Sequence, residues 1–157
     1  MNLSHIEWTV ELVEEWLNMA AKTERALPPV YRKGPAGRKW EVVCEWYELL
    51  WDQDDDDREP KFRPTNEQVS QWEEVVLKWF QLVDSGKDKK ILWLRACEMG
   101  WARIGKRVGL TRQTVAVRHH SALRDLARSL KTFYHIISQN PTVDIHRQSA
   151  PNNKAKV

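Results

Sequence analysis

Apolar residues recur every three to four positions along most of the chain, which is the period of an α-helix. Val13 and Leu17 show this spacing in the first such segment, which Pro28–Pro29 ends. Alternating runs of β-branched residues, which would predict strands, are absent. The pattern therefore predicts an all-α fold, with helices over residues 9–26, 39–51, 66–83, 89–98, 101–108 and 112–137.

Polar residues stand where several of these helices should begin. Thr9 stands at the start of the first predicted helix and Thr111 directly before the last, and a threonine hydroxyl can accept a backbone N–H of the first turn. Thr65 precedes Gln68 by three residues, which is the spacing of a capping box. We expect Asp88 to cap the fourth helix. The helix starts are therefore predicted independently of the apolar pattern.

The last predicted helix has two unlike faces on a helical wheel. One face is mainly apolar and consists of Val115, His119, Ala122, Leu126, Leu130, Phe133 and Ile137. The opposite face is mainly basic and consists of Val117, Arg124, Arg128 and Lys131. We expect the first face to pack in the core and the second to remain exposed.

The stretch WARIGKRVGLTRQTV, residues 101–115, sets two glycines among apolar residues. Gly105 within a helix costs about 1 kcal/mol relative to alanine, which close packing against the next helix would offset. Gly109 ends the short helix, since a left-handed residue just past a helix costs glycine least. Leu110 then fills the corner, and Val115 anchors the following helix. This spacing predicts a helix-turn-helix, whose second helix enters the major groove of DNA.

The longer stretch WARIGKRVGLTRQTVAVRHHSALRDL resembles the fourth region of bacterial sigma factors, which reads the −35 promoter element. The resemblance covers about residues 88–130 and includes the preceding helix, DKKILWLRACEMG. From WTVELVEEWL through LPPV to TRQTVAVRHH, the chain also resembles a small family common in phages and prophages. That family has no known function and a C-terminal helix-turn-helix. The resemblance therefore implies a sigma-region-four-like lobe at the C-terminal end.

By matching positions, the resemblance implies that five residues face base edges: Arg112, Gln113, Thr114, Ala116 and Val117. Arginine can bond guanine bidentately, glutamine can pair with adenine, and valine can contact the thymine methyl group. We interpret a second set as contacts to DNA phosphates, which position a protein without reading sequence. This set consists of Arg103, Lys106, Arg107, Arg118, His120, Arg124 and Arg128.

One position departs from the sigma pattern. Three residues after Val115 the family has a buried aliphatic residue, and this chain has Arg118. Two explanations are open: the helix rotates so that Val117 packs instead, or Arg118 extends to a phosphate.

The net charge of +3 conceals a division between the two halves of the chain. Residues 1–87 contain 11 Lys+Arg and 18 Asp+Glu, a balance of −7, and residues 88–157 contain 14 and 4, a balance of +10. A positive field confined to one part attracts polyanions there. We therefore expect a DNA-binding lobe over residues 88–140, followed by a disordered tail over residues 141–157.

The acidic half is rich in tryptophan, and the whole chain has nine. We expect residues 1–87 to form a helical lobe that serves oligomerisation or partner binding. Most of its tryptophans should be core, but we expect Trp8, Trp46 and Trp51 to be exposed for such an interface.

The sequence disfavours several other classes of protein. The chain contains no uninterrupted run of about 18 apolar residues, so we expect no membrane span. The N-terminus carries acids where a signal peptide carries bases, and Cys44 and Cys97 show no disulfide pattern, so we expect a cytoplasmic protein. We expect no metal and no cofactor. His119 and His120 point apart on a helix, and the run Asp54–Asp57 is interpreted as a solvated linker.

No catalytic arrangement is legible, and neither Ser121 nor Tyr134 has the surroundings of a recombinase nucleophile. We therefore expect a non-enzymatic, sequence-specific double-stranded DNA-binding protein. It would act as a transcriptional regulator of a phage or mobile element, as a homodimer or higher oligomer. One alternative is a small terminase-like subunit that brings DNA to a terminase large subunit. Another is an adaptor that uses the helix-turn-helix to contact RNA polymerase or another protein.

Overall fold

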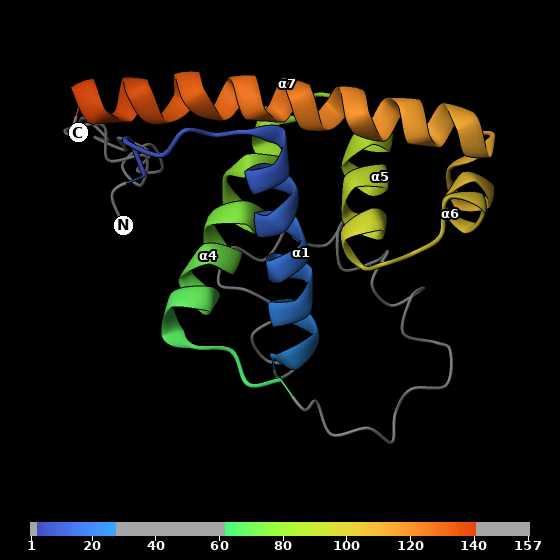
Figure 1. Cartoon of the computed structure of the whole chain (residues 1–157), viewed down its shortest axis with the longest axis horizontal. Helices are drawn as coiled ribbons and strands as arrows, with labels where there is room; N and C mark the ends of the chain where they lie inside the picture. The colour runs from blue at the N-terminus through green and yellow to red at the C-terminus, as the bar shows by residue number, and fades with distance from the viewer. Residues whose placement is uncertain (1–2, 28–61, 141–157) are drawn as a thin grey trace, which may run out of the picture.

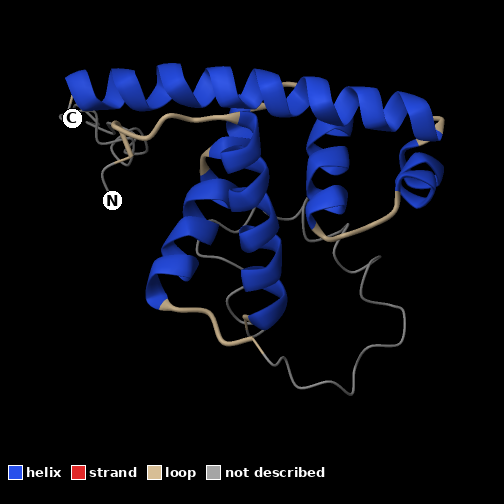
Figure 2. Cartoon of the chain, in the orientation of Figure 1, coloured by secondary structure: helices blue, strands red, loops and turns tan. Residues whose placement is uncertain are grey.

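The computed structural model describes residues 3–27 and 62–140, and within these ranges the chain is helical with no strand (Figures 1 and 2). The elements are α1 (Val10–Ala26), α4 (Asn66–Leu77), the 3-10 helix η1 (Trp79–Leu82), α5 (Gly86–Ala96), α6 (Trp101–Val108) and α7 (Arg112–Gln139). The all-α prediction is confirmed for this part of the chain. The predicted helix over 39–51 and the tail over 141–157 lie outside the described residues.

Most helix starts follow the predicted caps. Oγ1 of Thr9 accepts the N–H of Leu12 at 3.3 Å, and Oγ1 of Thr111 accepts the N–H of Thr114 at 3.2 Å. Thr65 forms the predicted capping box at the start of α4. These three predictions are confirmed, because each depends only on residues within one turn.

The predicted cap of the fourth helix is wrong. Oγ of Ser85 accepts the N–H of Asp88 at 3.4 Å, so α5 begins at Gly86 and Asp88 lies inside its first turn. A serine hydroxyl three residues before a free N–H is also an N-cap. The predicted helix over 66–83 is also interrupted, since α4 ends at Leu77 and η1 follows.

The long helix α7 runs along one side of the described part of the molecule (Figure 1). Helices α1, α4 and α5 lie beneath it, and α6 lies beneath its N-terminal end. The first five residues of the predicted apolar face of α7 are buried, and Phe133 is half-buried. The five are Val115, His119, Ala122, Leu126 and Leu130. Ile137 is 39% exposed, contrary to the prediction, and Tyr134 is buried instead. The buried stripe therefore turns slightly around the helix toward its C-terminal end.

A large core joins α1, α4, η1, α5 and the C-terminal half of α7. Aromatic rings form its centre: the ring of Trp8 meets Trp16 and Trp79 edge-on at centroid distances of 5.1 Å each, and stacks on Tyr134 at 5.4 Å. The prediction that Trp8 is exposed is therefore wrong, since it is 1% exposed. Trp46 and Trp51 lie outside the described residues.

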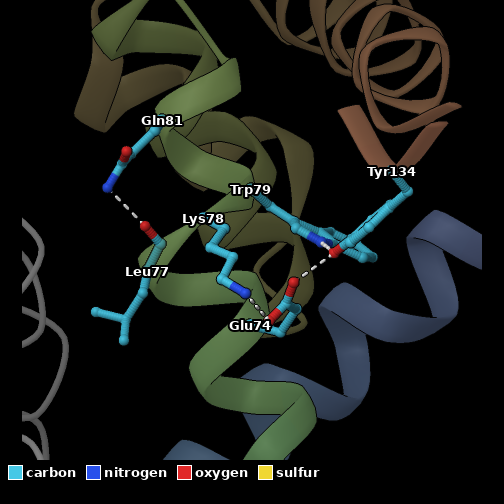
Figure 3. A network of polar contacts seen from close by, with 6 residues as sticks. All are labelled: Glu74, Leu77, Lys78, Trp79, Gln81 and Tyr134. Carbon is cyan, nitrogen blue, oxygen red and sulfur yellow. Dashed lines mark hydrogen bonds and ion pairs between the residues drawn. The ribbon is translucent and has the colours of Figure 1, made fainter. Parts of the chain in front are cut away.

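A buried polar network fixes the C-terminal half of α7 to α4 and η1 (Figure 3). The hydroxyl of Tyr134 accepts the indole N–H of Trp79 at 2.9 Å and donates to Oε1 of Glu74 at 2.7 Å. Lys78 pairs with the other carboxylate oxygen of Glu74 at 2.7 Å. Burial, followed by the bond to Glu74, raises the pKa of Tyr134 well above its usual value. The phenol therefore stays protonated and acts as a structural link.

A second, smaller core joins α5, α6 and the start of α7. It consists of Ile91, Leu94, Met99, Ile104, Val108 and Val115, with Trp101 and Leu110 partly buried against it. Helices α5 and α7 each contribute some residues to the large core and others to the smaller one. The large core contains residues from both sides of the predicted lobe boundary at position 87. Through the smaller core, the start of α7 packs against α5.

Candidate nucleic-acid interface

The corner between α6 and α7 depends on a close approach at Gly105. A Cβ on this residue would lie 2.5 Å from the carbonyl oxygen of Leu110 and 3.6 Å from the backbone nitrogen of Arg112. The carbonyl of Gly105 accepts the N–H of Leu110 at 2.9 Å, so the turn is bonded at the same point. The predicted close approach at Gly105 is confirmed, but the atom within 3.0 Å belongs to the turn and not to the following helix. The neighbouring atoms are the backbone of the turn and of the first residue of α7.

Gly109 ends α6 in the left-handed conformation, with φ +73° and ψ 34°. A side chain would be strained in this conformation, as predicted. The chain then reverses through Leu110, which is partly buried against the smaller core, and Thr111 caps α7. The two helices are therefore held at a fixed angle by two glycines, one apolar residue and one cap.

The burial of Val115 and His119 decides which side of α7 faces outward. Of the predicted base contacts, Arg112, Gln113, Thr114 and Val117 are exposed, and Ala116 is half-buried. Val117 is 67% exposed, an unusual value for a large apolar side chain. The hydroxyl of Thr114 lies 2.8 Å from that of Thr111, so it is directed toward the cap.

Six of the seven predicted phosphate contacts are exposed. Exposed residues of this set are Arg103, Lys106 and Arg107 on α6, and His120, Arg124 and Arg128 on α7. Residues 99–137 contain eight Lys+Arg and a single acid, Asp125, which lies 3.8 Å from Arg128 in a solvent-exposed pair. Exposed pairs at this distance are weak, so the surface keeps a strong positive charge.

Arg118 is arranged differently. Its Nε donates to Oδ1 of Asp88 at 2.9 Å, and its Nη2 donates to Oγ of Ser85 at 3.3 Å. One explanation for this departure from the sigma pattern, packing of Val117, is wrong because Val117 is exposed. The ion pair with Asp88, 30 residues earlier in the chain, was missed by sequence reasoning, since no local pattern links the two positions.

His119 packs in the corner beneath the exposed face. Its ring meets the indole of Trp101 edge-on at 5.0 Å, and the guanidinium of Arg95 lies 4.2 Å above the same indole. Burial, with smaller effects of the nearby charges of His120 and Arg95, lowers the pKa of His119 to about 4. The imidazole is therefore neutral near pH 7, and the interpretation of His119 as a packed residue is confirmed.

The fold and this surface define an all-α protein in which α6 and α7 meet at a tight turn between Gly105 and Thr111, and both helices expose basic side chains. The chain belongs to the family described as "Domain of unknown function (DUF6362)", which matches residues 25–126. The match includes α4, α5, α6 and the N-terminal half of α7. No curated protein and no solved structure matches the chain.

Two negative findings apply to the described residues alone. None of their helices is both long enough and apolar enough to span a membrane. Within the same ranges, no group of three or more His, Cys, Asp or Glu side chains is arranged to hold a metal ion. The run Asp54–Asp57 lies outside these ranges.

Proposed function

We propose that this protein binds double-stranded DNA in a sequence-specific manner, with the N-terminal half of α7 in the major groove. The observation that carries the proposal is the open, basic face of α7. Its side chains project from a helix that Gly105, Val115 and His119 hold at a fixed angle to α6. A helix that enters a groove needs a rigid attachment on one side and free side chains on the other.

In this proposal Arg112 and Gln113 read base edges. Both are exposed in the first turn of α7, and their side chains can bond guanine and adenine bidentately. Val117 follows one turn later and contacts a thymine methyl group, which gives its exposed apolar side chain a partner. Ala116 lies beside it. The Thr114 hydroxyl is directed toward Thr111, so Thr114 contributes less to base reading than Arg112 and Gln113.

Six exposed residues then bind phosphates on both sides of the groove: Arg103, Lys106, Arg107, His120, Arg124 and Arg128. These contacts orient the protein and supply most of the affinity without reading sequence. Because each phosphate that is neutralised releases counterions, binding should weaken steeply as salt rises.

We further propose that the protein is a transcriptional regulator that works in the cytoplasm as a dimer, in a phage or mobile element. The support for this role is the resemblance to sigma region four and to the phage family. A two-fold dimer would present two copies of α7 to half-sites one helical turn apart. Light scattering tests the assembly: a dimer supports the regulator, whereas a larger ring supports a terminase-like subunit.

The DNA-binding proposal is tested by selecting bound fragments from a random duplex pool and titrating the enriched duplex by fluorescence anisotropy. Arg112→Ala and Gln113→Ala should each weaken binding by about 1–3 kcal/mol and relax the preference at one base pair. Lys22→Ala, an exposed base on α1, is the matched control and should have little effect. If no duplex is enriched or bound at low salt, the proposal is wrong, and co-purification with RNA polymerase would then favour the adaptor.

A further inference from the structure

Arg118 and Asp88 form an ion pair between α7 and the first turn of α5. Besides the bonds to Asp88 (2.9 Å) and Ser85 (3.3 Å) from Arg118, Oγ of Ser85 accepts the N–H of Asp88. The side chains of Arg118 and Asp88 are 34% and 24% exposed, compared with 80% and 70% for Arg128 and Asp125. The pair is therefore partly shielded from water, and its charge-assisted hydrogen bond is strong.

The ion pair lies on the flank of α7, between its buried and exposed faces. Arg118 follows Val117, the most exposed apolar residue of the α7 face. Three positions earlier, Val115 is fully buried in the smaller core. Because successive residues on an α-helix are separated by about 100°, Arg118 lies about 60° around the helix from Val115, and the buried valine and the ion pair hold α7 at two neighbouring points. Together they limit rotation of α7 about its own axis.

We infer that the Arg118–Asp88 ion pair is a positioning device that sets how accurately α7 reads DNA sequence. This inference rests on the DNA-binding function proposed above. Bidentate bonds from Arg112 and Gln113 require their side chains to meet base edges at a fixed rotation of the helix. Asp88, although it lies on α5, is therefore a specificity-determining residue.

The inference gives Arg118 a role different from a phosphate contact. Asp88 and Ser85 accept two of the five N–H groups of the Arg118 guanidinium, and the Asp88 carboxylate compensates its charge. A nearby carboxylate also repels the phosphate that would approach. Arg118 consequently does not add to the number of counterions released on binding, and the salt dependence separates the two roles.

The experiment compares the full-length wild type with Asp88→Asn, Arg118→Gln and the double variant. Anisotropy titrations use the selected duplex and a scrambled duplex of equal length at several salt concentrations. Glu98→Gln is the control, since it removes the same unit of negative charge at an exposed position two residues beyond the end of α5. Melting curves establish that each variant is folded.

We expect Asp88→Asn and Arg118→Gln each to reduce the preference for the selected duplex by about tenfold, the effect of one misaligned base contact. The double variant should be no worse than either single variant, because both remove the same ion pair. Glu98→Gln should keep the preference. Arg118→Gln should leave the salt slope on the scrambled duplex unchanged.

Three results would overturn the inference. A folded Asp88→Asn variant with undiminished preference would show that the ion pair does not position α7. A salt slope lowered by about 0.9 in Arg118→Gln would show that Arg118 binds a phosphate, and this result does not depend on the folding of Asp88→Asn. A wild type that binds neither duplex would instead refute the proposed function, and the inference with it.

Discussion

Gly105 is the residue on which the geometry of the α6–α7 corner depends. A Cβ there would lie 2.5 Å from the carbonyl oxygen of Leu110, a backbone atom that cannot move without opening the turn. We therefore expect Gly105→Ala to lower the free energy of unfolding by about 1–3 kcal/mol, the usual cost of overpacking. Urea unfolding followed by circular dichroism measures this change.

Gly86 provides the matched control for this substitution. It is the first residue of α5, and a Cβ there would meet nothing within 4 Å. Gly86→Ala should therefore leave the free energy of unfolding unchanged or raise it by up to about 1 kcal/mol. Equal losses in the two variants would contradict the close approach at Gly105.

His119 links the stability of the same corner to pH. Burial lowers its pKa from 6.5 to about 4, so the unfolded chain binds more protons than the folded chain between these values. Stability should consequently rise with pH through this window, and fall by up to about 3 kcal/mol as pH drops from 7 to 4. Urea unfolding at a series of pH values follows the change.

The contribution of His119 is isolated by difference, because carboxylates also titrate at low pH. The stability of the wild type minus that of His119→Phe should shrink as pH falls, whereas His120→Gln, at an exposed position, should follow the wild type. A difference between wild type and His119→Phe that stays constant from pH 7 to pH 4 would refute this assignment.

At the scale of the helices, local features were predictable and tertiary ones were not. The caps at Thr9, Thr65 and Thr111 and the end of α6 at Gly109 depend on atoms within one turn, and the sequence contains all of that information. Burial of Trp8 depends instead on rings from η1 and α7 that are remote in sequence. Trp8 precedes α1 and belongs to no helical period, so the apolar pattern of the sequence cannot show this.

The attachment of α7 to α4 and η1 gives a prediction at the same scale. Tyr134→Phe keeps the ring stacked on Trp8 but removes the hydroxyl that joins Glu74 to Trp79. Leaving these two groups without their partner should cost about 1–3 kcal/mol of unfolding free energy. Thermal unfolding monitored by tryptophan fluorescence measures the loss.

The neighbouring ion pair is the control for Tyr134→Phe. Lys78→Met removes the pair between Lys78 and Glu74, in which the lysine side chain is 46% exposed, so it should cost less than about 1 kcal/mol. If Lys78→Met is as destabilising as Tyr134→Phe, the stability of this region comes from the charge of Glu74 and not from the buried hydroxyl.

At the scale of the whole molecule, the division of charge was readable from the sequence, but the partners of individual charges were not. The exposed positions of Gln113, Arg124 and Arg128 follow from the 3.6-residue period once Val115 is taken as buried. The pairing of Arg118 with Asp88 requires α5 and α7 to meet, which only the tertiary fold determines. Sequence therefore predicts which side of α7 is open, but not which cations on it are already paired.

The same charge distribution separates residues that position the protein on DNA from residues that read it. Arg124 and Arg128 are exposed on α7, three and four turns beyond Arg112, where they would follow the DNA backbone past the groove. The double variant Arg124→Ala/Arg128→Ala should lower the salt slope by about 1.8, that is about 0.9 per phosphate, on selected and scrambled duplexes alike. Its preference for the selected duplex should stay that of the wild type.

Arg112→Ala is the comparison, since it removes an exposed arginine from the N-terminal end of the same helix. It should reduce the preference for the selected duplex much more than it changes binding to the scrambled one. If the double variant loses as much preference as Arg112→Ala, the two sets of residues do not have separate roles. The DNA would then cross α7 in another direction, with the base edges facing the middle of the helix.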